Sequence, residues 1–285
     1  MQTQDELEAL VRAVQSSAKY RMVSVDLIRS IGARELLARG SLRDAIKACK
    51  SKLHQVGAAY MPARAQYERW EQSLRAAAGD QTALRSACRQ VLAQHASTRE
   101  RLPIVEAIFQ RTLVELAPVE SVLDVACGLN PLAAPWMPLA PAARYDACDI
   151  YADMVAFIRH CLPLMGLSGD VAVRDVTDGL PERPPADVAL LLKAVPCLEQ
   201  IDKGCVPRIL DSLPTRHIVV SYPVRSLGGA DRRMVDNYAA HMRSLLQGRN
   251  WLCQRFDFDT ELVFLLEKPA RPSGTAEATL KQGAS

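Results

Sequence analysis

Residues 121–131 (SVLDVACGLNP) constrain the fold of this chain more than any other stretch. Their apolar β-forming residues form a short continuous run, which predicts a buried strand. The strand is expected to stop at Gly128, because a residue without Cβ lets the backbone approach a ligand closely. Pro131 suits the first turn of a helix. A strand, a tight turn and a helix start in this order predict the ligand-binding edge of an open α/β sheet.

Two cofactors fit such a turn. A dinucleotide fingerprint requires three glycines, whereas only Gly128 is present here. S-adenosylmethionine (SAM) carries no phosphate and does not require a glycine-rich cradle. Asp149 follows about one βαβ step later, where a carboxylate accepts the ribose hydroxyls of either cofactor. The shortage of glycine favours SAM, with NAD or no cofactor as the alternatives. Asp124, inside the apolar strand, requires a partner, because burying a lone carboxylate is costly.

The charge of the chain is unevenly distributed. The 285 residues carry a net charge of +3 and are 49% hydrophobic. Residues 1–102 contain 17 Lys and Arg against 10 Asp and Glu, whereas the remainder contains 18 against 22. A basic N-terminal part on a mildly acidic core suggests a polyanionic partner, although a solvated helical surface explains the charge equally well. We expect a cytoplasmic protein with reduced thiols, because the eight cysteines form no Cys-x-x-Cys pair and neither a signal peptide nor a membrane span is recognisable.

The pattern of elements predicts two domains and a tail. Residues 1–100 are rich in helix formers, and amphipathic spacing predicts helices near 5–14, 24–38, 41–57, 62–78 and 80–94. Ser97 and Glu100 have the spacing of a capping box. Residues 101–268 alternate strands with helices, and residues 269–285 have the composition of a disordered tail.

The strands of the second domain predict an α/β fold with a doubly wound sheet of seven strands. They are expected at 121–126, 144–149, 170–176, 187–193, 216–222, 251–258 and 261–267. The last two are expected to form an antiparallel pair, which a methyltransferase sheet has and a nicotinamide-binding sheet normally lacks. Pro135 and Pro138 should shorten or kink the helix after the first strand.

Several polar residues are candidates for binding. Asp175 closes the third strand and either accepts the adenine amino group or caps the next helix. Arg101 is a candidate for a bidentate contact with a carboxylate such as that of methionine. Pro196-Cys197 resembles the nucleophilic Pro-Cys of RNA cytosine-C5 methyltransferases, although a structural cysteine is the simpler interpretation. The arginines and tyrosines of residues 221–238 suit a nucleotide, and the five histidines show no metal spacing.

Five strings along the chain together resemble one family, the aminoglycoside-resistance 16S rRNA (guanine(1405)-N(7))-methyltransferases. They are residues 52–54 with 57–60 (KLH, GAAY), 95–102 (HASTRERL), 123–132 (LDVACGLNPL), 221–229 (SYPVRSLGG) and 260–268 (TELVFLLEK). The resemblance runs from about residue 15 to 268. It implies a SAM-dependent methyltransferase fold with an N-terminal helical domain. Cys197 departs from the family pattern, which weakens the nucleophile interpretation.

The resemblance also implies the residues of two sites. The SAM site would comprise Tyr60, His95, Ala96, Ser97, Arg101, Ala126, Gly128, Asp149, Asp175, Val176, Leu191 and Gln200. The 16S rRNA of the 30S subunit would be contacted by Lys19, Arg21, Lys50, Lys52 and His54, and the flipped guanine by Arg225, Met234 and Asn237. A monomer without a metal is expected.

The implied chemistry explains why no catalytic base is expected. Guanine N7 has an in-plane lone pair and no proton at neutral pH, so alignment alone supplies most of the catalysis. N7 lies in the deep major groove of A-form RNA, and the base must therefore be extruded. Two alternatives are an RNA cytosine-C5 methyltransferase that uses Cys197 and an RNA-binding module without activity on a methyltransferase scaffold.

Overall fold

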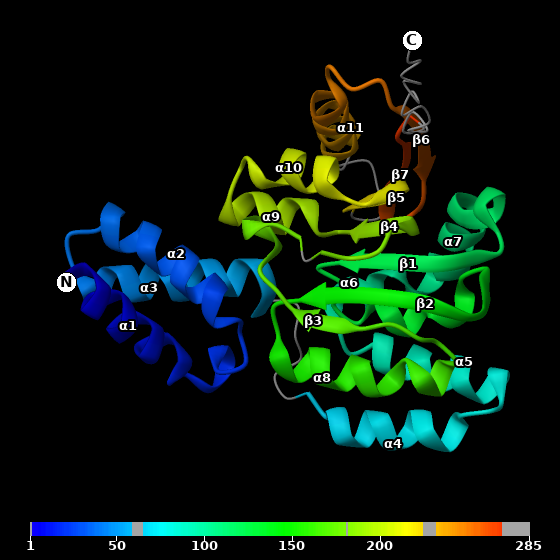
Figure 1. Ribbon diagram of the computed structural model, residues 1–285, viewed down its shortest axis with the longest axis horizontal. Coiled ribbons are helices and arrows are strands. Elements are labelled where there is room, and N and C mark those ends of the chain that lie inside the picture. The colour runs from blue at the N-terminus through cyan, green and yellow to red at the C-terminus, as the bar shows by residue number, and fades with distance from the viewer. Residues whose placement is uncertain (1, 59–64, 181, 225–231, 270–285) are drawn as a thin grey trace, which may run out of the picture.

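A mixed sheet of seven strands forms the centre of the molecule (Figure 1). The computed structural model describes residues 2–58, 65–180, 182–224 and 232–269. The strand order is β3-β2-β1-β4-β5-β7-β6. The strands are β1 (Val119–Val125), β2 (Leu139–Asp149), β3 (Val171–Val173), β4 (Ala186–Leu192), β5 (Thr215–Pro223), β6 (Leu252–Asp257) and β7 (Glu261–Glu267). All seven expected strands are therefore present.

The sheet is parallel from β3 to β5 and ends in the expected antiparallel hairpin of β6 and β7. β7 inserts between β5 and β6, so that the last strand in the chain is an inner one. Its six residues from Glu261 to Leu266 are all buried. The order reverses between β1 and β4, and the crevice at such a reversal is where open α/β sheets bind their ligands.

Each face of the sheet is covered by its own helices and its own apolar core. On one face, strand residues such as Leu123 and Leu191 pack on α9 (Val195–Ile201), α10 (Cys205–Ser212) and α11 (Arg232–Leu246). On the other face, residues such as Val122 and Leu190 pack on α5 (Gln81–Leu92), α7 (Val105–Leu113) and α8 (Ala152–Cys161). This alternation along buried strands produces the three-layer architecture of a doubly wound fold.

Two segments differ from the usual helix pattern. After β1 the chain forms only the 3₁₀ segment η5 (Asn130–Trp136), which contains Pro135, so the predicted shortening of this helix is confirmed. The predicted capping box is wrong. The helix α6 (Ala96–Arg101) begins before Ser97, so its N-cap residue is His95. Thr98 instead donates its hydroxyl proton to the carbonyl oxygens of Leu92 and His95, and this contact joins the start of α6 to the end of α5.

The N-terminal helices form a lobe beside the carboxyl edge of the sheet (Figure 1). The lobe comprises α1 (Gln2–Gln15), η1 (Ala18–Tyr20), α2 (Val25–Ala38), α3 (Leu42–Leu53) and the π-helical turn η2 (His54–Ala58). Backbone hydrogen bonds fix it to the segment after β2: Ser24 N–H donates to the Ile150 carbonyl, and Ala152 N–H donates to the Met22 carbonyl. The lobe is therefore anchored directly beside the end of a sheet strand.

The helices α4 (Tyr67–Ala77) and α5 lie with the sheet rather than with this lobe. Tyr67 and Trp70 of α4 form an aromatic cluster with Phe157 of α8, with ring centroids 5.1 and 5.8 Å from that of Phe157. Arg85 of α5 donates from Nε to the carbonyl oxygen of Pro135 in η5. The domain boundary near residue 100 stays a prediction from sequence. In the structure, the helices that pack together as the lobe end with η2. None of the helices that the structure describes is both long and apolar enough to cross a membrane.

Candidate functional site

A pocket opens at the carboxyl ends of the parallel strands, at the reversal of strand order. Its lining surrounds about 850 Å³ of space, part of it open solvent. Each of the first four strands delivers a residue to it: Ala126 follows β1, Asp149 ends β2, Asp175 follows β3 and Lys193 follows β4. The pocket is therefore a product of the sheet topology.

The backbone at this edge is in an unusual conformation at two neighbouring strand ends. Ala126 and Lys193 both have positive φ, at 54° and 59°, although neither is a glycine. Such conformations cost about 1–3 kcal/mol each and cluster at functional sites. Gly128 has φ of 53°, and a Cβ there would lie 3.3 Å from His95 Cε1. The strand-end turn thus packs tightly against His95, and the expected close approach of Gly128 to a ligand stays a prediction.

His95 lies at the start of α6 and is buried in the pocket wall. Burial, together with the neighbouring cations Arg101, Lys193 and Arg99, lowers the pKa of its imidazole to about 4. The ring is therefore neutral at physiological pH and does not add to the positive charge of the pocket.

Asp149 is held by the backbone of the two loops that flank the pocket. Its Oδ2 accepts from Gly128 N–H at 2.8 Å, and its Oδ1 accepts from Ile150 N–H at 2.7 Å. Burial raises the pKa of this carboxyl above its ordinary value, and the backbone hydrogen bonds from Gly128 and Ile150 oppose the shift. Each oxygen retains a further lone pair, so the carboxylate can accept two more donors.

Asp175 has one oxygen that finds no partner in the described protein. Its Oδ1 accepts from Thr177 N–H at 3.0 Å and from the Thr177 hydroxyl at 2.7 Å. Its Oδ2 is buried and has no hydrogen-bond partner. An unsatisfied buried acceptor is rare in native proteins, so this atom marks a place for a ligand donor. The helix-cap interpretation of Asp175 is correct for Oδ1 and leaves Oδ2 available.

Buried ion pairs centred on Glu261 of β7 lie beside the pocket. Arg101 donates from Nε and Nη2 to the two oxygens of Glu261, at 2.8 and 3.2 Å. Lys193 Nζ lies 3.4 Å from Glu261 Oε1, and the Ser221 hydroxyl donates to Oε2 at 2.6 Å. The side chains of Arg101 and Glu261 are only 2% and 0% exposed. Lys193 Nζ also pairs with Glu100 Oε2 at 2.8 Å, so the two cations are balanced by two carboxylates, the buried Glu261 and the more exposed Glu100.

These contacts continue to the carboxylate inside β1. Arg101 Nη1 donates to Asn130 Oδ1 at 2.9 Å, and Asn130 Nδ2 donates to Asp124 Oδ2 at 2.7 Å. The Tyr145 hydroxyl donates to the same oxygen at 2.7 Å. Burial raises the pKa of Asp124 to about 7, although both hydrogen bonds oppose that shift. Asn130 and Tyr145 are thus the partners that a carboxylate at Asp124 was expected to need. Its other oxygen, Oδ1, is buried and has no hydrogen-bond partner among the described residues.

The structure gathers most of the predicted cofactor residues around the pocket. His95, Ser97, Arg101, Ala126, Gly128, Asp149, Asp175 and Val176 line it. Ala96, Leu191 and Gln200 lie outside its lining, and Leu191 is a core residue between the sheet and α9. Tyr60 falls outside the described residues.

Sequence reasoning missed a further part of the lining, and most of it comes from chain segments beside the predicted residues. It comprises Val56, Gly57, Thr98, Cys127, Ile150, Tyr151, Met154, Arg174, Leu192, Lys193, Ala194, Cys197 and Leu198. Val56 and Gly57 belong to η2 of the lobe, and Gly57 is packed so closely that a Cβ would lie 2.9 Å from the Tyr151 ring. The one available signal was Lys193, a lysine directly after an apolar strand, which is unusual at a buried position.

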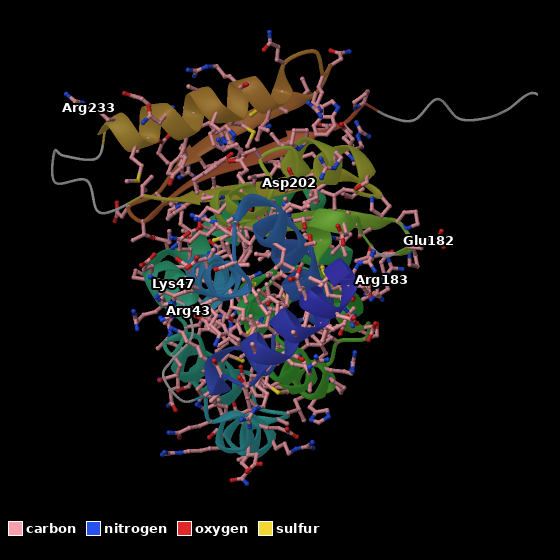
Figure 2. All side chains as sticks on the ribbon, turned by 90° about the vertical axis from the view of Figure 1, so that its left-hand side faces the viewer. Arg43, Lys47, Glu182, Arg183, Asp202 and Arg233 are labelled. Carbon is pink, nitrogen blue, oxygen red and sulfur yellow. The ribbon has the colours of Figure 1, made fainter. Side chains whose placement is uncertain are left out.

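The exposed face of α3 carries a stripe of basic side chains. Arg43, Lys47, Lys50 and His54 are spaced by four, three and four residues, and such residues share one face of a helix. Figure 2, which looks onto the lobe end of the molecule, shows Arg43 and Lys47 close together at its surface, and Arg233 at the start of α11 lies on the same side of this view. Lys50 and His54 are among the predicted RNA contacts, whereas Arg43 and Lys47 are not.

The other predicted RNA contacts differ in how far they are available. Lys19 and Arg21 are exposed, and Lys19 Nζ lies 2.9 Å from His54 Nδ1. Lys52 forms an ion pair of 2.7 Å with the buried Glu35, whose pKa is lowered mainly by this hydrogen bond. Lys52 therefore contributes to the packing of the lobe through this ion pair.

The residues expected around the base lie on α11. Met234 and Asn237 are in the first turns of this helix, and Arg225 falls outside the described residues. Cys197, the alternative nucleophile, lies on α9 in the pocket wall. Within the described ranges, no group of three or more His, Cys, Asp or Glu side chains is arranged to hold a metal ion.

Comparisons with known proteins agree over nearly the whole chain. The profile of a ribosomal RNA methyltransferase family (FmrO) matches residues 16–265. A 16S rRNA (guanine(1405)-N(7))-methyltransferase of Micromonospora echinospora is 35% identical over 270 residues, which are 93% of this chain and 98% of the relative. A protein of the same name from Serratia marcescens is 31% identical, covering 90% of this chain and 96% of the relative.

Solved structures give the same result. The 16S rRNA methyltransferase RmtF in complex with S-adenosyl-L-homocysteine is similar with a TM-score of 0.77 and 31% identity, covering 93% of this chain and 98% of that one. The 16S rRNA methylase RmtB is similar with a TM-score of 0.75 and 27% identity, covering 92% and 98%. With the strand order and the switch-point pocket described above, these matches show that the chain belongs to the FmrO family of ribosomal RNA methyltransferases.

Proposed function

We propose that this enzyme transfers a methyl group from S-adenosyl-L-methionine to N7 of guanine 1405 in the 16S rRNA of the assembled 30S subunit, and thereby confers aminoglycoside resistance. The observation that carries the proposal is the match to relatives named for this reaction over 93% of the chain. The pocket at the strand-order reversal supports it, because the polar atoms there fit the cofactor.

The donor and acceptor groups of the pocket suit SAM on three counts. Asp149 retains lone pairs for the two ribose hydroxyls, and the buried Asp175 Oδ2 has no partner and suits the adenine amino group. The guanidinium of Arg101 retains N–H donors at this corner and suits the methionine carboxylate. When bound, SAM supplies an electrophilic methyl group on a sulfonium sulfur. The absence of a general base among the assigned roles follows from the unprotonated N7 of guanine.

Arg101 can still hold a carboxylate although it is paired with Glu261. Of its five N–H donors, the Glu261 and Asn130 contacts use three. The remaining two, one on each terminal nitrogen, are available for a ligand oxygen. In our proposal Glu261 and Asn130 fix the plane of the guanidinium before the cofactor arrives, so that little conformational entropy is lost on binding.

The basic stripe of α3 supports a docking role for the lobe. RNA affinity depends on cations that neutralise phosphates, and such cations must be exposed rather than paired within the protein. Arg43, Lys47 and His54 are exposed, whereas Lys52 is engaged by Glu35. We therefore assign the RNA contact mainly to Arg21, Arg43 and Lys47, together with Lys19 and its neighbour His54. Lys50 is half-buried and donates to Ser17 Oγ at 2.7 Å, so it is first a structural residue, as Lys52 is.

The deciding experiment is methyl transfer from labelled SAM to purified 30S subunits, followed by mass mapping of the 16S rRNA. We expect one methyl group on N7 of guanine 1405, and the variant Cys197→Ser should retain this activity. Methylation of a cytosine C5 that disappears in Cys197→Ser would establish the cytosine alternative. Binding of 30S subunits without transfer and without SAM binding would establish an inactive RNA-binding module. Gel filtration of the enzyme, alone and with 30S subunits, would test our further expectation that it acts as a monomer.

A further inference from the structure

His241 joins three elements around the side of the pocket that faces α11. It lies in α11, its Nδ1 is 3.1 Å from the hydroxyl of Tyr222 in β5, and its Nε2 is 2.9 Å from Glu199 Oε1 in α9. Both ring nitrogens of His241 are therefore engaged. A single neutral tautomer satisfies both contacts: Nε2–H donates to Glu199, and the Tyr222 hydroxyl donates to Nδ1.

Aromatic rings protect this connection. Tyr222 is fully buried, and Tyr238 of α11 stacks on it with ring centroids 4.6 Å apart and planes 26° apart. Phe264 of β7 meets the Tyr222 ring edge-on at 6.1 Å. The imidazole of His241 also meets it edge-on, at 6.0 Å. Because aromatic packing excludes water from one end of the Glu199–His241–Tyr222 chain, the geometry of α11 against β5 is well defined.

The two helices that His241 connects carry different parts of the site. On α9, Cys197 and Leu198 line the cofactor pocket directly before Glu199. On α11, Met234 and Asn237 precede His241 by seven and four residues, which places them on the same helix face. His241 therefore sets the separation between a wall of the cofactor pocket and the face of α11 expected to meet the base.

We propose that His241 is a positioning residue for methyl transfer, which holds α11 at a fixed distance from α9 through Glu199 and Tyr222. The inference rests on the proposed function, because it concerns the alignment of the target base with the methyl donor. A reaction without a general base depends on alignment, and a misplacement of about 1 Å can reduce its rate on the order of 100-fold. Neither His241 nor Glu199 needs to touch the reacting atoms.

The test is single-turnover methylation of 30S subunits at saturating SAM and saturating 30S, with wild type and His241→Ala. We expect the transfer rate of His241→Ala to fall about 10- to 100-fold, while the Kd for SAM and the Kd for 30S each change less than about twofold. The pair is half-exposed, with side-chain exposures of 31% and 26%. Its loss should therefore lower the Tm by only about 2–4 °C, and the variant will fold.

Two further variants separate positioning from general stability. Glu199→Gln keeps an acceptor for His241 Nε2–H and should retain most of the transfer rate, whereas Glu199→Ala should lose it as His241→Ala does. The matched control is His160→Ala, because His160 forms a comparable pair of 3.2 Å with Glu71 on α4 and α8, on the opposite face of the sheet. His160→Ala removes a more exposed pair, so it should lower the Tm no more than His241→Ala does and should leave the transfer rate unchanged.

The outcomes distinguish this inference from the proposed function. If wild type methylates guanine 1405 and His241→Ala transfers at the same rate, the positioning role is wrong and the function stands. A fall in SAM affinity that accounts for the whole loss of rate would equally overturn the positioning role. If wild type transfers no methyl group to 30S subunits, the proposed function fails and the inference fails with it.

Discussion

The carboxyl ends of β1 and β4 and the outer face of α3 both gather cations, but they do so under opposite conditions. Arg101 and Lys193 are buried and share one carboxylate, Glu261, which is 0% exposed. Arg43 and Lys47 are exposed and close together at the surface of the lobe (Figure 2). A small ligand needs donors that are already oriented in a shielded site, whereas a polyanionic surface needs cations that remain hydrated until contact. Lysine and arginine side chains therefore contribute differently to stability and to binding in the two regions.

The largest expected effect is the loss of the buried counter-charge. Glu261→Ala leaves two buried cations with one carboxylate fewer, and removing one partner of a buried pair costs about 3–5 kcal/mol. Urea unfolding followed by circular dichroism measures this free energy. Asp257→Ala is the matched control on the neighbouring strand, because its pair with Arg255 is 58% and 41% exposed and should be worth about 0–1 kcal/mol. Equal losses in the two variants would contradict the contrast.

The second prediction concerns the pH dependence of stability. Asp124 has a pKa raised from 3.8 to about 7 in the folded state, so the folded protein binds its proton more tightly than the unfolded chain does. Stability from this group is present below about pH 4 and is lost as the pH rises through about 7, an effect on the order of 4 kcal/mol.

The comparison of wild type with Asp124→Asn isolates this effect. His95, whose pKa is lowered to about 4, acts in the opposite direction between about pH 4 and 6.5 and is common to both proteins. From pH 5 to pH 8, the free energy of unfolding should fall more for the wild type than for the variant. Parallel losses in the two proteins would show that Asp124 is not the group responsible.

The third prediction addresses the cofactor side of the comparison. Asp149→Asn replaces an oxygen that accepts from Gly128 or Ile150 by an amide donor, and hydrogen bonds to charged groups are worth about 1.5–3 kcal/mol. We expect the Kd for SAM, measured by calorimetry, to rise roughly 10- to 100-fold. Asp187→Asn, at the opposite edge of the sheet, should leave that Kd unchanged. An unchanged Kd in Asp149→Asn would remove this residue from the cofactor site.

The fourth prediction separates backbone strain from steric contact in the turn after β1. Gly128 and Gly166 both have positive φ, but a Cβ at Gly128 would meet His95 at 3.3 Å, and one at Gly166 would meet nothing within 4 Å. Alanine at either position should cost about 1–2 kcal/mol from the left-handed conformation. Only Gly128→Ala should also weaken SAM binding, by displacing His95. Similar SAM affinities in both variants would show that the turn tolerates a side chain.

The smallest effect is expected on the basic stripe. Lys47→Ala should change the unfolding free energy by less than about 0.5 kcal/mol, because the side chain is exposed. If Lys47 contacts a phosphate, the slope of 30S affinity against salt should decrease by about 1. Arg75→Ala on α4, which is exposed and paired with Glu71, is the control that should leave this slope unchanged. Identical slopes in all three proteins would move the docking surface away from α3.

The parts of this molecule that depend on local pattern could be predicted from the sequence. All seven strands, the final hairpin and the short helix after β1 follow from β-propensity and proline, which act over a few residues. The strand-end positions of Asp149 and Asp175 followed from the same pattern, because the carboxyl ends of parallel strands meet at one edge.

Contacts between distant residues could not be predicted in this way. The expected contact of Arg101 with the methionine carboxylate stays a prediction. Its protein partner Glu261, which was not expected, is separated from it by 160 residues. Lys52 has the same charge as Lys50 and lies on the same helix. Only the packing of α2 against α3 shows that Lys52 forms an ion pair with Glu35. The capping box failed because His95 and Thr98 provide other contacts at the start of α6.

The position of Glu261 has a consequence for the order in which the enzyme matures during translation. Arg101 and Lys193 leave the ribosome well before Glu261, which belongs to the last strand to be made and is inserted between β5 and the edge strand β6. Until that strand is in place, Arg101 lacks the carboxylate that accepts from its Nε and Nη2, and Lys193 keeps only its pair with Glu100. The guanidinium of Arg101 is therefore held in its final orientation only after the chain has been made as far as β7.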